Sequence, residues 1–342
     1  MRKATLRDVA KEAGVSLSTA SLVLNRKGLF SQEVRDRVAE AAQKLAYARL
    51  AAANGARKYQ GTVAILVFED PEKAFVWDFF RRIILPLEAV IARARFCAVI
   101  IPVSLRHDAQ EVFEKVAAAK VQALFSIDYG NAELFQRLEA QGIPVVVINN
   151  SSFQTQCYSV CVDDFHGAYE GAKHLLTSGH RQLLYVEYDR PDMPALLNDR
   201  FIGFTKALDE AKIPFPDADR LTVNLFDMAA LQRQLQQIFQ CKPAPTAIFA
   251  HDDYLAARII VALRNLHIAV PAEASIIAPG DTLDYAQPFT PQITTMCINN
   301  ELMGKLAGEM LLERLRAPQQ PLHVLKVNQQ LIDRGSCQPL AA

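Results

Sequence analysis

Four side chains near the start of the chain have the chemistry and spacing of a surface that reads nucleic acid. Leu17, Ser18, Ser21 and Leu22 stand at i, i+1, i+4 and i+5, which places them on one face of a helix. An exposed helix face usually carries long charged side chains. Hydroxyls can instead reach phosphates or base edges, and leucine methyls can meet thymine methyls in the major groove of DNA. The alternative is that Leu17 and Leu22 belong to a hydrophobic core.

Such a face needs a helix that is braced by others, and the flanking sequence predicts this arrangement. Thr5 is the expected N-cap of a first helix that stops at Gly14, and Ser16 is the expected N-cap of a second helix over 17–24. A third helix is expected to begin near Ser31, where apolar residues again repeat at helical spacing. Two short helices joined by a glycine-containing turn, with a third packed against them, predict a helix-turn-helix.

The charge of the chain is unevenly distributed. Lys and Arg number 37, as do Asp and Glu, so the net charge of the 342 residues is zero. Residues 1–60 hold twelve basic and five acidic residues, a net charge of +7, which leaves −7 on the other 282. A basic head on an acidic body predicts contact with nucleic acid or a membrane surface, and the alternative is a solvated basic face.

The rest of the chain alternates apolar, strand-like runs with amphipathic helical stretches. The clearest strand-like runs are 63–68, 97–103, 123–127, 145–148, 183–187, 247–250 and 276–278. The clearest helical stretches are 79–93, 109–119, 132–141, 167–178, 200–211 and 254–266. This alternation predicts a doubly wound α/β fold with a mostly parallel sheet, in which ligands bind at the carboxyl ends of the strands.

The head resembles the lactose/galactose repressor (LacI/GalR) family of bacterial transcription regulators. The resemblance rests on Thr5-Leu-Arg-Asp-Val-Ala-Lys-Glu-Ala-Gly-Val-Ser16, Ser18-Thr-Ala-Ser-Leu-Val-Leu-Asn25, Ser31-Gln-Glu-Val-Arg-Asp-Arg-Val38 and Leu45-Ala-Tyr47. It implies phosphate contacts by Thr5, Ser16, Thr19, Ser21, Asn25 and Ser31, and base reading by Leu17, Ser18 and Leu22. Many members have Arg at the position of Leu22, so a bidentate contact with guanine is not expected here.

The body is similar to the same family in Gly142-Ile-Pro-Val145, Val162-Asp-Asp164, Gly179-His-Arg181, Arg200-Phe-Ile-Gly-Phe204, Pro245-Thr-Ala-Ile-Phe-Ala-His-Asp-Asp253 and Ile293-Thr-Thr295. The resemblance implies a type I periplasmic-binding-protein fold, with two Rossmann-like lobes and an effector held between them. Crossovers between the lobes are expected near 160, 290 and 322. The expected domains are a DNA-binding domain over 1–47, a hinge over 48–61, and an effector-binding and dimerisation domain over 62–337. The expected lobes are 62–160 with 291–322, and 161–290 with 323–337.

The hinge departs from the family pattern, in which a helix wedges a leucine into the minor groove. Ala56 stands at the wedge position and Gly55 interrupts the helix. Contacts with the DNA backbone through Arg49, Arg57 and Lys58 are therefore expected instead of insertion between bases. Leu50 is the alternative, as a displaced wedge.

Polar and aromatic side chains follow the predicted strands and form the candidate effector site. They are Asp70, Phe75, Trp77, Asp128, Asn149, Arg200, Asp252 and Asp281. An aromatic face with carboxylate, amide and guanidinium groups suits a sugar or sugar derivative. The resemblance implies that Arg200 contacts effector oxygens. Trp77 has the alternative of covering the interlobe cleft or a dimer patch, while Asp163 and Asp253 are expected to cap helices.

Other classes of protein find less support. In each of the acidic pairs 163–164 and 252–253, the two adjacent carboxylates point in different directions and cannot flank one bond. The sequence also contains no G-x-S-x-G, H-E-x-x-H or Walker motif. Both observations argue against an enzyme. No cofactor or metal is expected. No membrane partner is expected either, because the apolar stretches have only the length of a strand and are too short to span a membrane. A solute-binding receptor for transport shares the body fold but would need a signal peptide, and the chain begins with the basic head. The expected protein is a cytoplasmic regulator that binds a near-palindromic double-stranded operator as a homodimer and is controlled by a small effector.

Overall fold

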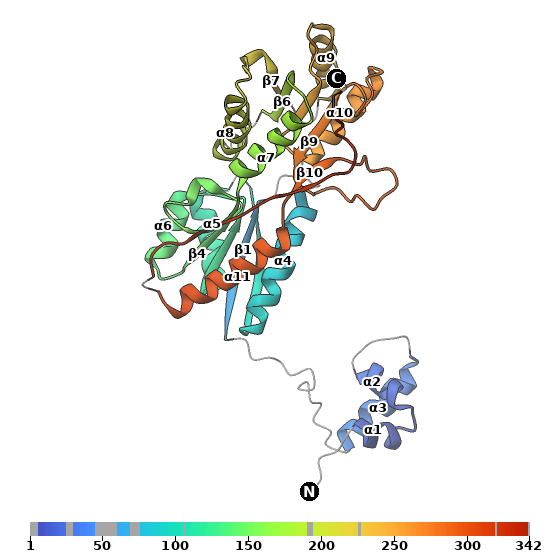
Figure 1. Ribbon diagram of the computed structural model, residues 1–342. Helices are drawn as coiled ribbons and strands as arrows, with labels where there is room; N and C mark the ends of the chain where they lie inside the picture. Colours follow the sequence, from blue (N-terminus) through green and yellow to red (C-terminus); the bar gives the residue numbers. More distant parts are fainter. Residues whose placement is uncertain are drawn as a thin grey trace. The chain divides into compact units, whose positions relative to one another are not determined.

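The computed structural model describes residues 6–24, 30–44, 60–68, 76–104, 107–189, 194–224, 227–318 and 320–340 (Figure 1). The chain divides into two compact units, Met1–Lys58 and Tyr59–Ala342. Of the expected hinge, 48–59 lies outside the described residues, and so do Arg49, Leu50, Ala56 and Arg57. Within the described part of the chain, no helix is both long and apolar enough to cross a membrane.

The first unit holds the three predicted helices. They are α1 (Leu6–Glu12), α2 (Leu17–Leu24) and α3 (Gln32–Lys44). Val9, Ala13, Val38 and Ala41 form their small core, which brings the apolar faces of α1 and α3 together. The turn between α1 and α2 passes through Gly14 at φ +65°, a left-handed conformation that glycine adopts without steric cost.

The second unit contains two six-stranded sheets, each of which forms one lobe. The first sheet has the order β11-β5-β4-β3-β1-β2 and the second the order β12-β10-β9-β8-β6-β7. The strands of the first are β1 (Gly61–Phe68), β2 (Phe96–Val103), β3 (Ala123–Ile127), β4 (Val145–Ile148), β5 (Tyr158–Val162) and β11 (Val324–Val327). Those of the second are β6 (Leu183–Tyr188), β7 (Arg220–Val223), β8 (Ala247–Ala250), β9 (Ser275–Pro279), β10 (Thr294–Cys297) and β12 (Gln330–Ile332). All pairings are parallel except that between β10 and β12, so the predicted α/β class is confirmed.

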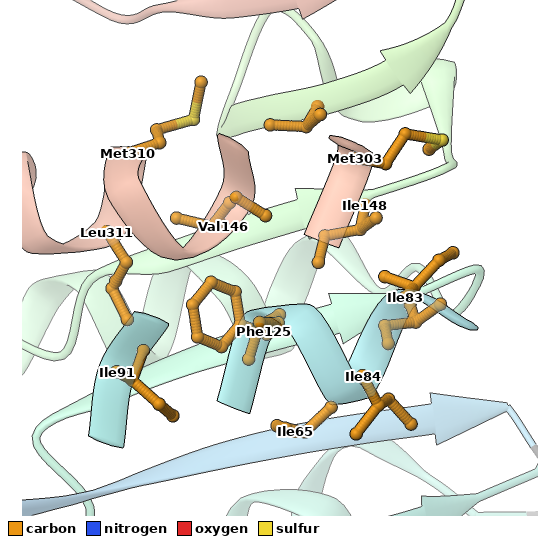
Figure 2. Close-up of a cluster of buried hydrophobic side chains, with 14 of the residues drawn as sticks. Ile65, Ile83, Ile84, Ile91, Phe125, Val146, Ile148, Met303, Met310 and Leu311 are labelled. Carbon is orange, nitrogen blue, oxygen red and sulfur yellow. The ribbon is translucent and has the colours of Figure 1, made fainter. Parts of the chain in front are cut away.

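Helices cover both faces of each sheet, as a parallel sheet requires. They are α4 (Val76–Arg93), α5 (Ala109–Ala118), α6 (Ala132–Ala140), α7 (Asp164–Thr177), α8 (Pro194–Glu210), α9 (Met228–Gln240), α10 (Asp253–Asn265) and α11 (Asn300–Arg316). Figure 2 shows α4 and α11 side by side over the first sheet, with Phe125 and Val146 of the sheet packed beneath them. The two helices approach closely at Gly304, where a Cβ would lie 2.1 Å from the carbonyl oxygen of Ile83.

The chain crosses between the lobes three times, and two of the crossings lie later than expected. The first follows β5, close to the expected position near 160. The second follows β10 and the third follows β11, because β10 is paired with β9 in the second sheet and β11 with β5 in the first. The expected lobe boundaries at 291 and 323 were therefore too early. The short apolar runs of β10 and β11 do not by themselves reveal which sheet each strand joins.

Candidate functional site

The exposed face of α2 is uncharged. The helix, Leu-Ser-Thr-Ala-Ser-Leu-Val-Leu, contains no acidic or basic residue, and Ala20 is buried against the rest of the unit. Leu17 is 46% exposed, so it is not part of the core, contrary to the alternative weighed above. Ser18 and Leu22 lie within α2, but their side chains are outside what the structure describes.

The hydroxyls around α2 and α3 also build the helix ends. Ser16 Oγ accepts a hydrogen bond from the backbone N–H of Thr19 at 3.0 Å and lies 2.8 Å from Thr19 Oγ1. Ser31 Oγ accepts from the N–H of Val34 at 3.4 Å, which caps α3 in the same way. A serine hydroxyl carries one donor beside its acceptor lone pairs, so the capping Ser31 keeps its hydrogen for a partner such as a phosphate oxygen. Ser16 and Thr19 use one of their two hydroxyl hydrogens in their mutual hydrogen bond and keep the other for such a partner. Ser21 is half-buried, and Thr5 and Asn25 lie outside the described residues.

In the first lobe the structure brings two predicted effector residues together. Asp128 follows β3 and Asn149 follows β4, and these strands are neighbours in the sheet. Asn149 Nδ2 donates a hydrogen bond to Asp128 Oδ1 at 2.7 Å. Both residues have left-handed backbone conformations, with φ of +58° and +59°, which Asp and Asn tolerate better than most residues. The two side chains thus form a polar pair at the carboxyl edge of the sheet.

In the second lobe Arg200 is held inside a buried cluster. The residue is only 6% exposed; its Nε donates to Asp164 Oδ1 at 2.7 Å and its Nη1 to the carbonyl oxygen of His251 at 2.6 Å. Burial raises the pKa of Asp164 above its ordinary value, and the guanidinium of Arg200 opposes that rise. Gln329 Nε2 also donates to Asp164 Oδ1 at 3.4 Å. Asp164, which immediately follows the first crossover, was not among the predicted site residues, although a buried arginine generally requires such a partner.

The residue that caps α10 is the neighbour of the one expected from the sequence. Asp252, not Asp253, is the N-cap of α10: its Oδ1 accepts from the N–H of Leu255 and from the hydroxyl of Tyr188, both at 2.7 Å. Asp253 is fully buried, and its Oδ2 accepts from the backbone of Thr282 and Leu283. Burial raises the pKa of Asp253 to about 6. Asp163 caps α7 as predicted, through a 3.2 Å hydrogen bond from His166 N.

Asp281 lies beside the second and third crossovers between the lobes, apart from the strand-end residues described above. Arg334 Nη2 contacts Asp281 Oδ1 at 2.8 Å, and Arg82 Nη1 donates to the Asp281 carbonyl oxygen at 3.1 Å. Trp77, at the start of α4, is 39% exposed and meets Phe80 edge-on, with ring centroids 6.2 Å apart. The remaining predicted effector residues, Asp70 and Phe75, lie outside the described part of the chain.

Comparison with protein families matches the two units separately. Residues 5–49 match the model described as bacterial regulatory proteins, lacI family, and 172–337 match the periplasmic binding protein-like domain. The head of the chain belongs to the LacI family of bacterial regulatory proteins. This LacI-family head distinguishes the chain from a solute receptor with the same body fold. The family model that matches the head describes regulatory proteins.

Proteins similar to this chain agree with it in length and architecture. The chain is 28% identical over 337 residues to the HTH-type transcriptional repressor PurR of Pectobacterium carotovorum subsp. carotovorum (strain PC1), covering 97% of this chain and 96% of that protein. Among solved structures, the transcriptional regulator CelR in complex with cellobiose is 22% identical with a TM-score of 0.69, covering 97% of this chain and 99% of CelR. A LacI-family regulator from Enterococcus faecium with bound ribose is 23% identical with a TM-score of 0.66, covering 82% and 100%. At these identities the solved structures support the fold alone.

Proposed function

We propose that this LacI-family protein is a transcriptional repressor that binds a near-palindromic operator as a homodimer and responds to a small effector held in its body. The observation that carries the proposal is the uncharged α2 with Leu17 exposed beside the buried Ala20. Exposed methyls and hydroxyls without charge suit the floor of the major groove. The similarity to proteins named as repressors supports the direction of control. An operator as target places the site of action in the cytoplasm.

The base-reading residues are Leu17, Ser18 and Leu22, and the phosphate-binding residues are Thr5, Ser16, Thr19, Ser21, Asn25 and Ser31. The capping geometry of Ser31 supports its assignment, because its hydroxyl accepts from its helix and can donate to a phosphate. The hydrogen-bonded hydroxyls of Ser16 and Thr19 keep one hydrogen between them for a phosphate. Arg49 and Arg57 of the hinge over 48–61 add phosphate contacts. Affinity therefore falls steeply with salt concentration, since each neutralised phosphate releases counterions.

Pairing of two chains is proposed because one head covers only a half-site. The first lobe offers an apolar surface for it: Leu85 of α4 is 54% exposed, and Val99 and Ile100 of the edge strand β2 are 37% and 44% exposed. Large apolar side chains that are exposed favour burial against another protein surface. A two-fold arrangement would present two heads to an inverted repeat.

The effector is proposed to be a sugar or sugar derivative that binds at the strand ends of the two lobes. Asp128 and Asn149 supply an oxygen-rich pair from the first lobe. Arg200 keeps its Nη2 without a hydrogen bond within the described residues, so it retains donors for a ligand oxygen. Asp252 adds a carboxylate from the second lobe. Asp70, Phe75 and Trp77 are proposed to supply the remaining contacts of the first lobe with the effector. Cellobiose and ribose in the related solved structures are consistent with this class.

Selection of bound fragments from the source genome tests the DNA-binding proposal. The expected result is an inverted repeat that is bound in a salt-sensitive way. Leu17→Ala is expected to weaken the selected site by about 1–3 kcal/mol if its methyls meet a base. Leu340→Ala is the matched control, because Leu340 is also 46% exposed but lies in the body. Recovery of random fragments only, or equal affinity in both variants, would contradict the proposal.

A thermal-shift screen of sugars, phosphosugars and nucleobases tests the effector class, because a ligand that binds only the folded state raises its stability. The expected result is a shift with a sugar that Asp128→Ala and Arg200→Ala both abolish. A shift with nucleobases only would refute the sugar class, and unchanged affinity in both variants would refute the site.

A further inference from the structure

A pocket of about 500 Å³ lies where the second and third crossovers pass between the sheets. Its walls come from α4 and α11 of the first lobe, from the end of β10 in the second lobe, and from the two crossovers themselves. The size is typical of sites for small molecules, which span about 300–1,000 Å³. Asp281, one of the predicted effector residues, lines this pocket, but Asp128, Asn149, Arg200 and Asp252 of the strand-end site do not. We call it the hinge pocket after the two crossovers between the lobes; it is not part of the hinge over 48–61.

Asn300 gives the hinge pocket an acceptor that the protein does not use. Asn300 is the first residue of α11, lines the pocket and is only 4% exposed. Its Oδ1 has no hydrogen-bond partner within the described residues. The neighbouring Asn299 is already engaged as the N-cap, accepting from the N–H of Leu302 at 2.9 Å. A buried polar atom without a partner costs free energy, which a ligand that donates a hydrogen bond would recover.

The charged groups of the hinge pocket balance one another. Arg82 is engaged with Asp78 and with the carbonyl of Asp281, whose carboxylate is engaged by Arg334. Lys326 and Glu301 remain, and neither makes an ion pair in the described part of the chain. One cation and one anion leave no net charge to attract a phosphorylated or strongly cationic ligand.

The other lining groups are carboxamides and aliphatic side chains. Asn328 and Gln330 of the third crossover add donors and acceptors, while Ile298, Leu306 and Val327 provide apolar walls. None of the described lining residues is aromatic, so a flat heteroaromatic ring would find no stacking partner. Carboxamides beside aliphatic walls suit a ligand that has many hydroxyls along C–H faces.

We propose that the hinge pocket is a second ligand site, which binds a small uncharged polyhydroxylated molecule such as a monosaccharide. The acceptor of Asn300 takes one hydroxyl hydrogen, and Lys326 donates to another oxygen. Because both lobes contribute to its walls, a bound ligand stabilises the lobe arrangement in which these walls meet. A ligand in the hinge pocket can thereby affect the arrangement of the lobes independently of an effector in the proposed strand-end site.

Isothermal titration of the full chain with D-glucose and D-ribose tests this site, with glucose 6-phosphate and adenine as charged and aromatic comparisons. Asn300→Leu removes the buried acceptor and is expected to weaken binding of the neutral sugar by roughly tenfold or more. Asn265→Leu, on the exposed surface of α10, makes the same chemical change away from the pocket and is expected to leave the affinity unchanged. Lys326→Met, at an exposed position of β11, provides an independent variant if Asn300→Leu does not fold.

The outcomes separate this site from the proposed function. Binding of a neutral sugar that Asn300→Leu or Lys326→Met weakens and Asn149→Leu does not supports the hinge pocket. Loss in Asn149→Leu with retention in both hinge variants overturns it and assigns the sugar to the strand-end site instead. Absence of binding by both neutral sugars, or tighter binding of glucose 6-phosphate or adenine, also overturns it. None of these results bears on operator binding, which the genomic selection tests.

Discussion

The buried ion pair between Arg200 and Asp164 predicts a large and pH-dependent loss of stability on substitution of the arginine. The two side chains are 8% and 4% exposed and lie 2.7 Å apart. Arg200→Met keeps much of the aliphatic volume but leaves the carboxylate of Asp164 buried without its cation. Breaking a buried pair in this way costs about 3–5 kcal/mol, whereas an exposed pair contributes about 0–1 kcal/mol.

The same helix offers a matched control. Lys206 and Glu210 also form an ion pair on α8, at 3.2 Å, but their side chains are 52% and 48% exposed. Lys206→Met is therefore expected to change the free energy of unfolding by less than about 1 kcal/mol. Urea denaturation followed by circular dichroism measures both variants, and the double variant Arg200→Met/Asp164→Leu is expected to recover much of the loss.

The sign of the pH dependence follows from the direction of the Asp164 pKa. Burial already raises that pKa in the folded chain, and removal of Arg200 removes the opposing attraction. A carboxyl group with a raised folded-state pKa destabilises the protein as pH rises through that value, because the folded state then resists losing the proton. The deficit of Arg200→Met should accordingly shrink as the pH is lowered through the raised pKa of Asp164. Equal losses in Arg200→Met and Lys206→Met, or a deficit that grows on acidification, would refute the argument.

Three further predictions concern other parts of the molecule. Gly304→Ala should lower the melting temperature measured by calorimetry, because its Cβ would lie 2.1 Å from the carbonyl oxygen of Ile83. This clash outweighs the preference of about 1 kcal/mol for alanine over glycine in an unhindered helix. An unchanged or higher melting temperature would contradict the close approach of the two helices. Asp253 has a folded-state pKa of about 6 against an ordinary 3.8, so its contribution should cost up to about 3 kcal/mol of unfolding free energy as pH rises through that interval. Asp253→Asn should remove this component in denaturation at pH 4 to 7, and an identical pH profile would count against it. Ser16→Ala should remove the α2 cap and lower the stability of the head by about 1 kcal/mol, and unchanged thermal unfolding of the head would exclude a capping role.

Local patterns accounted for the helices of the head and for the class of the body. Capping residues, glycine stops and apolar repeats act over a few residues, so the three short helices were predictable from their own sequence. Alternation of apolar runs with amphipathic stretches likewise predicted a parallel α/β body. The sequence also predicted that Asp128 and Asn149 follow strands, and the pairing of β3 with β4 in the structure brings the two residues together at one edge.

Other features depended on contacts between residues far apart in the chain. Membership of β10 and β11 in opposite sheets is decided by strand pairing, which a four-residue apolar run does not specify. Asp252 and Asp253 are chemically identical neighbours, and only the loop at 282–285 makes the second one buried. The sequence by itself determined that the chain has a helix-turn-helix head and an α/β body with polar residues at its strand ends. Tertiary structure alone decided which of those polar groups are buried in ion pairs and which line a pocket, because burial and pairing arise where distant segments meet.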